Sequence, residues 1–290
     1  MKYSVSRIVK IHCWGGLGSQ LLAVGLLFDL RNSYPRREFE LVIHSSGVTR
    51  RVSEIDFLSS ELRIIFIDDY LSKKIMNDEG GINHYFHARG YLKYLLNFFK
   101  IVVTKDSTHF KLYPWTNSIR CHYGLTSISR ETIRFISSFI PETDIVIPKS
   151  AGFVLGVHFR SGDLLSKKNS SVIDLDIITG LANNLINGLP KRDAYLLILS
   201  DSKLDKQKEL ALKDFSFIWQ SRNTWETFDV LLKTNGFVGT NSKVSLWVTL
   251  FRWALGVQGE ILLPKSLYEQ FKRITNLSDD RQSSHNIHSF

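Results

Sequence analysis

The second half of the chain alternates short apolar segments with longer segments of helical periodicity, and this alternation constrains the fold more than any other feature. Each apolar segment has the length of a buried strand, and a polar turn follows it. Strands that alternate with helices form a parallel sheet through right-handed crossovers. We therefore predict an α/β fold, with strands over 153–158, 195–199, 215–219, 236–238 and 261–263 and helices over 174–187, 204–212, 225–233 and 244–255.

The first half shows a shorter version of the same pattern. A strand over 8–13 and a glycine turn precede a helix over 19–32, and two further strands are expected over 41–44 and 64–67. Residues 75–138 are aromatic and mostly helical in pattern, and the segment PETDIVIPK resembles a linker because prolines stand near both ends. The sequence predicts a domain over 1–148, a second over 149–275 that faces it across a cleft, and a disordered polar tail over 276–290.

Composition narrows the function classes. The chain has 290 residues, enough for two domains with their own cores. Two cysteines, Cys13 and Cys121, are too few for a disulfide scaffold. We expect Cys13 to be a buried thiol in a protein of a reducing compartment, and a single disulfide is the alternative. The net charge of +9 is scattered, and no nucleic-acid-binding motif occurs. The sequence predicts neither a signal peptide nor a transmembrane helix.

A glycine-rich turn, GGLGSQ, follows the first expected strand and opens the first helix. Gly16 and Gly18 would let the backbone approach a ligand, and the helix N-terminus beyond them favours negative charge. The turn is not a complete dinucleotide-binding fingerprint, because Leu21 stands where its third glycine would be. From the turn alone, a tight strand-to-helix connection is the favoured interpretation.

The segment HFRSGD comes directly after the apolar strand over 153–158. In an open parallel sheet, ligands bind beyond the carboxyl ends of the strands, which places His158, Arg160 and Asp163 at a binding edge. The guanidinium of Arg160 suits a diphosphate because it donates two parallel hydrogen bonds. Asp163 could hold Arg160 or bind a ligand hydroxyl. The alternative is a surface salt bridge beside a structural histidine.

Two further polar segments follow expected strands. Asp201 comes after the strand over 195–199 and could accept hydrogen bonds from a base or a ribose, or could belong to a helix N-cap. The segment GTNSKVSLW follows the strand over 236–238, where Thr240, Asn241 and Ser242 offer side-chain donors beside a helix N-terminus. They could equally be ordinary capping residues.

Metal chemistry finds little support in the sequence. Asp174 and Asp176 match the D-x-D pattern with which many glycosyltransferases hold a metal and a diphosphate, but they also begin a helix, where acidic residues are favoured. Asp68 and Asp69 are weaker candidates. Zinc-binding, P-loop and serine-hydrolase motifs do not occur. We therefore predict no metal ligands.

Taken in order, four segments resemble the fucosyltransferase superfamily, particularly its α-1,2-fucosyltransferases. The family's G-G-L-G-N-Q-L turn corresponds to GGLGSQL, its H-x-R-R-G-D motif to HFRSGD, its S-D-D after a strand to LILSDS, and its N-S-S-F-S-W-W to NSKVSLW. About 30 positions carry the resemblance, and 75–149 are not recognisable. Three positions depart from the family pattern and put the donor sugar or the acceptor in question: Ser161, Ser202 and the pair Lys243-Val244.

The resemblance implies a GT-B architecture of two Rossmann-like domains. It also implies that the protein transfers fucose from GDP-fucose to a glycan with inversion, without a metal or other cofactor. It implies that Arg160 clamps the β-phosphate as the catalytic residue and that His158 and Asp201 contact the nucleoside. The other donor-binding residues that it implies are Gly16, Gly18, Asn241, Ser242 and Ser245.

Three functions therefore stay open. The leading one is a fucosyltransferase of surface polysaccharide synthesis, acting in the cytoplasm near lipid-linked acceptors at the inner face of the membrane. The second is a transferase of the same fold that uses another sugar nucleotide. The third is a non-catalytic protein that binds glycans or nucleotides. The acceptor, the linkage and the general base are not predicted.

Overall fold

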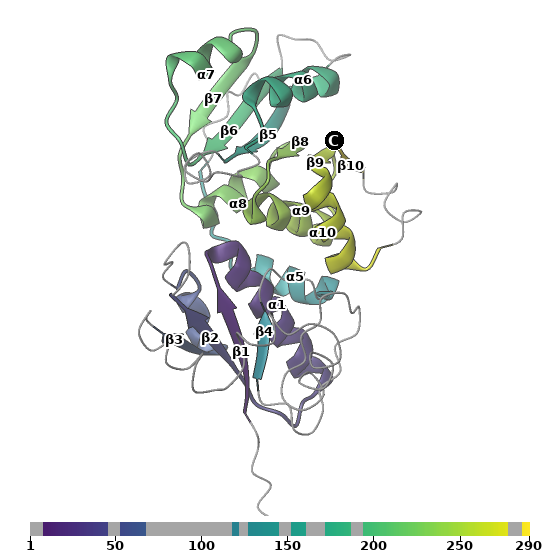
Figure 1. The fold of residues 1–290 in the computed structure, drawn as a ribbon. Helices are drawn as coiled ribbons and strands as arrows, with labels where there is room; N and C mark the ends of the chain where they lie inside the picture. Colours follow the sequence, from purple (N-terminus) through teal and green to yellow (C-terminus); the bar gives the residue numbers. More distant parts are fainter. Residues whose placement is uncertain are drawn as a thin grey trace, which may run out of the picture. The chain divides into compact units, whose positions relative to one another are not determined.

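The structure is a computed structural model, and it divides the chain into two compact units. Unit 1 comprises 1–132 and 273–276, and unit 2 comprises 133–272 and 277–290. The structure describes residues 8–45, 53–67, 118–121, 127–144, 152–160, 172–186, 194–277 and 286–290. Each unit contains one sheet with parallel strand pairs, so the predicted α/β class with two Rossmann-like domains is confirmed (Figure 1). The cleft expected between the domains stays a prediction.

Unit 1 is built on a four-stranded sheet in the order β3-β2-β1-β4. The strands are β1 (Val9–Trp14), β2 (Phe39–His44), β3 (Arg63–Ile67) and β4 (Ser118–Cys121), and a short 3₁₀ helix, η1 (Asp56–Ser60), precedes β3. The helix α1 (Leu17–Ser33) follows β1 and lies against the sheet (Figure 1). The first three turns of α1 carry mainly apolar and small residues on all faces of the helix, and these turns are buried.

Unit 2 contains a six-stranded sheet in the order β10-β9-β8-β5-β6-β7. Its strands are β5 (Phe153–Phe159), β6 (Ala194–Ser200), β7 (Ser216–Gln220), β8 (Gly236–Gly239), β9 (Ile261–Leu263) and β10 (Ile287–Ser289). Numbered from β5 along the chain, the strands run 3-2-1-4-5-6 across the sheet, which is the strand order of a doubly wound dinucleotide-binding domain. The point at which the order reverses lies between β5 and β8.

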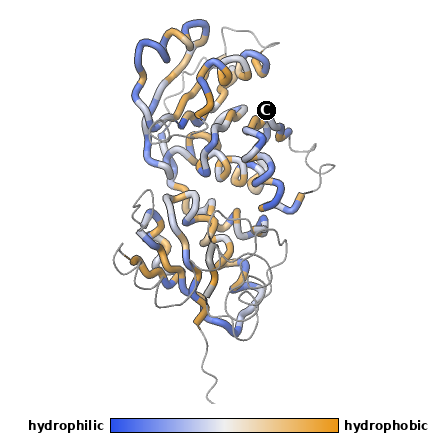
Figure 2. Tube along the Cα trace, in the orientation of Figure 1, coloured by the Kyte–Doolittle hydropathy of each residue, from blue (hydrophilic) through white to orange (hydrophobic). Residues whose placement is uncertain are grey.

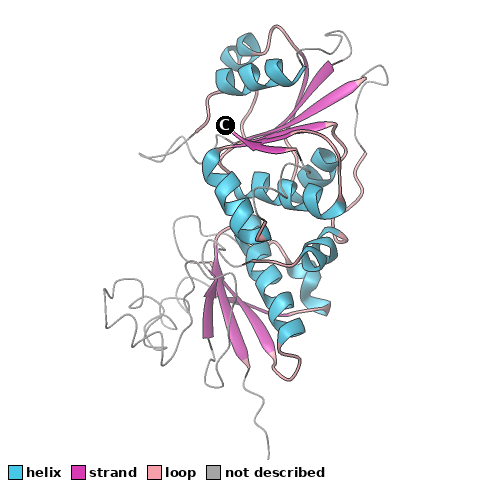
Figure 3. Ribbon diagram, turned by 90° about the vertical axis from the view of Figure 1, so that its right-hand side faces the viewer, coloured by secondary structure: helices cyan, strands magenta, loops and turns pink. Residues whose placement is uncertain are grey.

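Helices cover both faces of the second sheet (Figure 3). The helices that lie wholly in unit 2 are α6 (Leu175–Ile186), α7 (Lys206–Ala211), α8 (Thr224–Leu232) and α9 (Lys243–Leu255). Two more helices, α5 (Arg130–Ser137) and α10 (Lys265–Thr275), have residues in both units. None of the helices in the described parts of the chain is long and apolar enough to cross a membrane.

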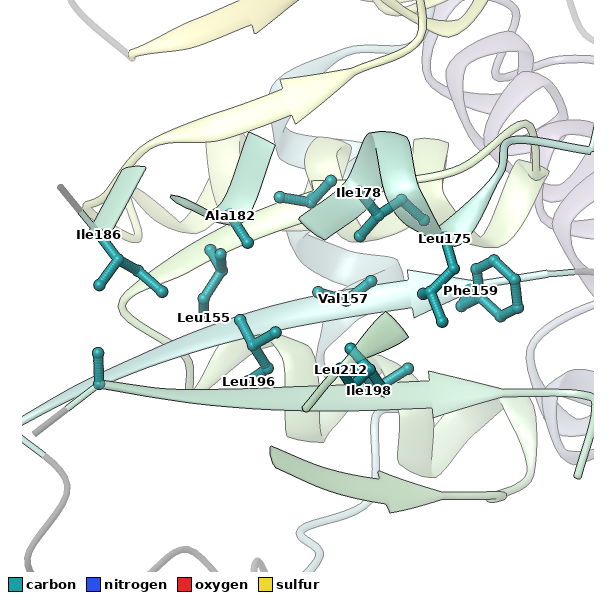
Figure 4. Packing of buried hydrophobic residues seen from close by; sticks show 12 residues of the cluster. Leu155, Val157, Phe159, Leu175, Ile178, Ala182, Ile186, Leu196, Ile198 and Leu212 are labelled. Atoms are coloured by element: carbon teal, nitrogen blue, oxygen red, sulfur yellow. The ribbon is translucent and has the colours of Figure 1, made fainter. Parts of the chain in front are cut away.

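The core of unit 2 explains why its strands are nearly continuous apolar runs. On one face, Ile178 and Ala182 of α6 pack against Leu155 and Val157 of β5 and against side chains of β6 (Figure 4). A sheet that is covered on both faces buries every side chain of its central strands. Hydrophobic residues accordingly follow the strands in both units (Figure 2).

A buried arginine, Arg252, links α9 to the C-terminal end of α8. Arg252 of α9 has no exposed surface and donates to the carbonyl oxygens of Leu231, Thr234 and Gln258 at 2.8–3.0 Å. Burial lowers the pKa of Arg252 to about 10. These carbonyl groups include the C-terminal end of α8, where a positive charge is favoured.

The prediction of a disordered tail is wrong for its last residues. β10 pairs in parallel with β9, and Phe290 N–H donates to Leu263 O at 2.9 Å. Ile287 is buried, although its neighbours in sequence are polar. Two apolar residues, Ile287 and Phe290, and main-chain pairing with a distant strand hold this segment in place. The polar composition of the tail did not indicate either feature.

The domain boundary also differs from the predicted one. Residues 133–148, which were assigned to the first domain, belong to unit 2, and 273–276 return to unit 1. Arg134 Nε donates to Ala254 O at 2.7 Å, and Thr143 N–H donates to the carboxylate of Asp229 at 2.7 Å. The PETDIVIPK segment therefore begins inside unit 2, and its prolines do not mark the division.

Candidate functional site at the carboxyl edge of the second sheet

The carboxyl ends of β5 and β8 meet at the reversal of strand order in unit 2. In open α/β sheets, ligands bind at this position. His158 is paired in register with Gly239, and the next residues of each strand leave the sheet. The polar segments that start with His158 and with Thr240 therefore emerge side by side, as the sequence predicts.

Three hydrogen bonds join these two segments, and a fourth lies within the second segment. Thr240 Oγ1 donates to His158 O at 2.9 Å and accepts from Arg160 N–H at 3.2 Å. Ser245 Oγ lies 2.8 Å from His158 Nδ1 and accepts from Thr240 N–H at 3.1 Å. The turn after β5 is thus fixed to the turn after β8 by two buried hydroxyl groups, and this sets the backbone of Arg160 and the ring of His158.

His158 is electrically neutral at neutral pH. Burial, and then the positive charge of Arg160, lower the pKa of His158 to about 4, although the carboxylate of Asp201 acts in the opposite direction. Both charges are therefore close enough to influence the imidazole. His158, Arg160, Asp201 and Ser245, which come from three segments of the sequence, are brought together by the structure.

Asp201 lies in the turn after β6 and is exposed. It does not cap the next helix, because the N-cap of α7 is Asp205, whose side chain accepts from Lys208 N–H. The turn is held instead by Ser202 N–H, which donates to Ser200 Oγ at 3.1 Å, and by Trp219 Nε1, which donates to Ser202 O at 3.0 Å. The capping interpretation of Asp201 is therefore wrong.

The N-terminus of α9 lies at the same edge. Ser242 is its N-cap and accepts from Val244 N–H at 3.1 Å, so the capping interpretation of Ser242 is confirmed. Asn241 Oδ1 accepts from Ser266 Oγ at 3.0 Å. The first turn of α9 contains no acidic residue, so the positive end of its dipole lies beside Arg160 without an opposing carboxylate in that turn.

Gly239 is required where β8 leaves the sheet. A Cβ atom at this position would lie 2.8 Å from the Cβ of Ser245. Only a glycine therefore lets the first turn of α9 come close enough for Ser245 to contact His158. In the sequence, the only signal for this role of Gly239 is its place between an apolar strand and a polar turn.

The corresponding edge of unit 1 has a different electrostatic character. Gly15 has a φ of 98°, which favours glycine, and Gly16 is the N-cap of α1. Leu17 N–H donates to Glu54 Oε1 at 3.1 Å, and Gln20 links Glu54 N–H to Gly15 O. A carboxylate of the chain itself therefore lies at the N-terminus of α1. The predicted donor-binding roles of Gly16 and Gly18 stay predictions, and Glu54 was missed because it is distant in sequence.

Two histidines and a tryptophan pack near the ends of β1 and β2. His12 Nδ1 lies 2.8 Å from His44 Nε2, and the rings of Trp14 and His44 stack with centroids 4.3 Å apart. All three side chains are buried. In the sequence, the signal for this cluster is the presence of histidines within apolar strands.

The carboxylates that the sequence offers as possible ligands do not form a metal site among the described residues. Asp163, Asp68 and Asp69 lie outside the described residues. Asp176 lies in the first turn of α6, where the helix dipole favours it. Among the described residues, no group of three or more histidine, cysteine, aspartate or glutamate side chains could hold a metal ion. Cys13 is a buried thiol.

No family model matches this chain, and no curated protein matches it significantly. Similar solved structures include S. aureus MnaA with UDP, which is 10% identical and has a TM-score of 0.45, over 88% of this chain and 78% of that one. The E. coli heptosyltransferase WaaC with ADP is 9% identical over 88% of this chain and 86% of its own, with a TM-score of 0.41. A glycosyl transferase of family 9 from Veillonella parvula is 10% identical over 98% and 85%, with a TM-score of 0.44.

None of these three is described as a fucosyltransferase. Similarities at 9–10% identity with TM-scores below 0.5 do not identify the reaction of this chain. The strand order and the residues at the edge of the second sheet are the observations from which its function has to be inferred.

Proposed function

We propose that this protein is a glycosyltransferase and that unit 2 binds the diphosphate of its sugar-nucleotide donor. The observation that carries the proposal is the hydrogen-bonded junction of His158, Thr240 and Ser245, which fixes the backbone of Arg160 beside the segment that leads into α9. This junction stands at the reversal of strand order, where the doubly wound fold places nucleotides.

The chemistry of glycosyl transfer suits such a site. When the bond between the sugar and the diphosphate breaks, negative charge develops on the departing phosphate oxygen. A guanidinium and a helix N-terminus at this edge can stabilise that charge, and a charge-assisted hydrogen bond contributes about 1.5–3 kcal/mol. Arg160 is therefore the proposed catalytic residue, and its role is to bind the leaving group.

The two units differ in their suitability for an anion. In unit 1, the carboxylate of Glu54 already accepts a hydrogen bond from the first residue of α1, and a phosphate would have to displace it. In unit 2, a neutral serine caps α9, and Arg160 lies nearby. Like charges repel, so we assign the diphosphate to unit 2.

For the donor we propose GDP-fucose, on the basis of the four motif resemblances and of Asp201. Guanine offers N1–H and an exocyclic amino group side by side, and one carboxylate accepts from both. Ser202, at a position where the family has a second aspartate, keeps another sugar nucleotide as the second candidate. The net charge of +9 suits a cytoplasmic enzyme at an anionic membrane surface, with a lipid-linked glycan as the proposed acceptor.

The test compares Arg160→Ala with Lys272→Ala, which removes the same charge from α10. Binding of GDP, UDP and CMP is measured by calorimetry, and release of fucose from GDP-fucose is measured with and without acceptor glycans. We expect Arg160→Ala to lower activity by about 30- to 1,000-fold, equivalent to roughly 2–4 kcal/mol, while Lys272→Ala changes little. Equal small effects would exclude the diphosphate role. Nucleotide binding with no turnover of any sugar nucleotide would favour a non-catalytic binding protein.

A further inference from the structure

We propose that Ser245 is a positioning residue whose hydroxyl group fixes the tautomer of His158, so that the ring presents its Nε2–H as a hydrogen-bond donor to the nucleotide. This inference rests on the proposed function for the identity of the ligand. The orientation of the ring and its tautomer follow from contacts within unit 2, which do not depend on that identity.

The hydrogen-bond pattern around Ser245 determines where its proton lies. Its Oγ accepts from Thr240 N–H at 3.1 Å and lies 2.8 Å from His158 Nδ1. A hydroxyl group has one hydrogen to donate. If that hydrogen is donated to Nδ1, both contacts are satisfied, and the neutral ring carries its own hydrogen on Nε2.

The opposite tautomer leaves the hydroxyl hydrogen without an acceptor. If Nδ1–H donated to Ser245 Oγ, the oxygen would accept twice and its hydrogen would need a third partner. Ser245 has no exposed surface, and within the described part of the chain no other hydrogen bond involves its hydroxyl group. A buried hydroxyl hydrogen without a partner is unfavourable, so the tautomer with Nε2–H is favoured.

The same contacts change the role expected for Ser245. The family resemblance implies that this serine lines the diphosphate site, but its side chain is fully buried, and its oxygen contacts Thr240 and His158. Gly239 provides the space for this arrangement, because a Cβ atom there would meet Ser245. Ser245 therefore acts on the ligand through His158.

A neutral imidazole with Nε2–H recognises an oxygen acceptor, such as a phosphate oxygen or a ribose oxygen. Burial and Arg160 lower the pKa of His158 to about 4, and Asp201 acts against them. Arg160 and Asp201 are the charged groups that influence the ring, and together with its burial they leave it neutral at neutral pH. The donor is therefore present at neutral pH without uptake of a proton.

Nuclear magnetic resonance of the imidazole nitrogens tests the tautomer directly. Long-range proton–nitrogen correlation spectra of isotope-labelled protein distinguish a protonated ring nitrogen from an unprotonated one, and the His158→Asn variant identifies the His158 signals by their loss. We expect unprotonated Nδ1 and protonated Nε2 in the wild-type protein. Protonated Nδ1 would overturn the proposal, and this measurement requires no variant of Ser245 to fold.

The matched variants are Ser245→Ala and Thr249→Val. Thr249 is also a buried hydroxyl residue of α9, but it donates to Ser245 O and does not contact His158. Ser245→Ala should mix the two tautomers and weaken GDP binding by roughly 3- to 10-fold, the effect of one neutral hydrogen bond. Thr249→Val should keep the wild-type tautomer and affinity. Unchanged tautomer and affinity in Ser245→Ala would refute the positioning role.

The two readouts separate this inference from the proposed function. If the wild-type protein shows the expected tautomer, and Ser245→Ala disturbs it, but GDP, UDP and CMP do not bind, then the nucleotide site is wrong and Ser245 still positions His158. If GDP binds but the tautomer is the opposite one, the nucleotide site survives and the role of Ser245 is refuted.

Discussion

Replacing His158 by asparagine should remove a pH dependence of stability that the wild-type protein carries. The imidazole is buried, with 8% of its surface exposed, and its pKa is lowered from 6.5 to about 4. Asparagine does not titrate, and its side-chain oxygen can still accept a hydrogen bond from Ser245. The two proteins should therefore differ in how their free energy of unfolding changes with pH, in addition to any constant difference in level.

The sign follows from the state that binds more protons. Between the two pKa values, His158 is protonated in the unfolded chain and neutral in the folded protein, so acid favours unfolding. The stability is complete above the unfolded pKa of 6.5 and is lost as the pH falls toward the folded pKa of about 4. At 1.36 kcal/mol for each pKa unit, the total is roughly 3 kcal/mol, of which about 2 kcal/mol is lost by about pH 5.

Urea unfolding at a series of pH values, followed by tryptophan fluorescence, measures this difference. Trp219, Trp247 and Trp253 all lie in unit 2 and report on the unit that contains His158. The wild-type minus variant free energy should fall by about 2 kcal/mol from about pH 7 to about pH 5. Ser245→Ala keeps the imidazole and should keep most of the slope. Parallel curves for the wild-type protein and His158→Asn would refute the assignment of a buried, neutral histidine.

Four further predictions concern the donor, the metal and the fold. GDP should bind about tenfold or more tightly than UDP or CMP, and Asp201→Ala should reduce this preference; tighter binding of UDP or CMP in calorimetry would exclude GDP-fucose as donor. Activity should survive EDTA, and a loss restored by manganese or magnesium would contradict this. Arg252→Met should lower the free energy of unfolding in urea by at least about 3 kcal/mol, because it leaves buried carbonyl groups without a donor. An unchanged urea midpoint would show that these carbonyl groups find other partners. Ile287→Ala should cost about 2–5 kcal/mol and His288→Ala, which is exposed on the same strand, less than about 0.5 kcal/mol; equal values would contradict the burial of β10.

The alternation in unit 2 was predictable because each of its central strands is buried on both faces. The strand expected over 153–158 is β5 (Phe153–Phe159), and the helix expected over 244–255 is α9 (Lys243–Leu255). An apolar run followed by a polar turn can be recognised locally in the sequence. Because such a run forms a buried strand, the pattern also predicts where the strand lies in the sheet. The edge position of the segments after β5 and β8 followed from the same logic.

Contacts between residues far apart in sequence were not predictable in this way. His158 and Ser245 are 87 residues apart, and Leu17 and Glu54 are 37 apart. No local pattern specifies which hydroxyl group meets which imidazole, or which carboxylate reaches a helix N-terminus. β10 was missed for the same reason, since its partner β9 supplies the hydrogen bonds that its own composition does not indicate.

The two units show how one strand order can support two kinds of edge. The order 3-2-1-4 occurs in both sheets, and in both a helix N-terminus follows a strand at the carboxyl edge. In unit 1, Glu54 supplies negative charge to α1, which disfavours an anion there. In unit 2, Ser242 caps α9 without a charge, and Arg160 adds a positive one. The backbone thus offers the same dipole twice, and the charges of the described side chains are the reason that we propose the second edge for the diphosphate.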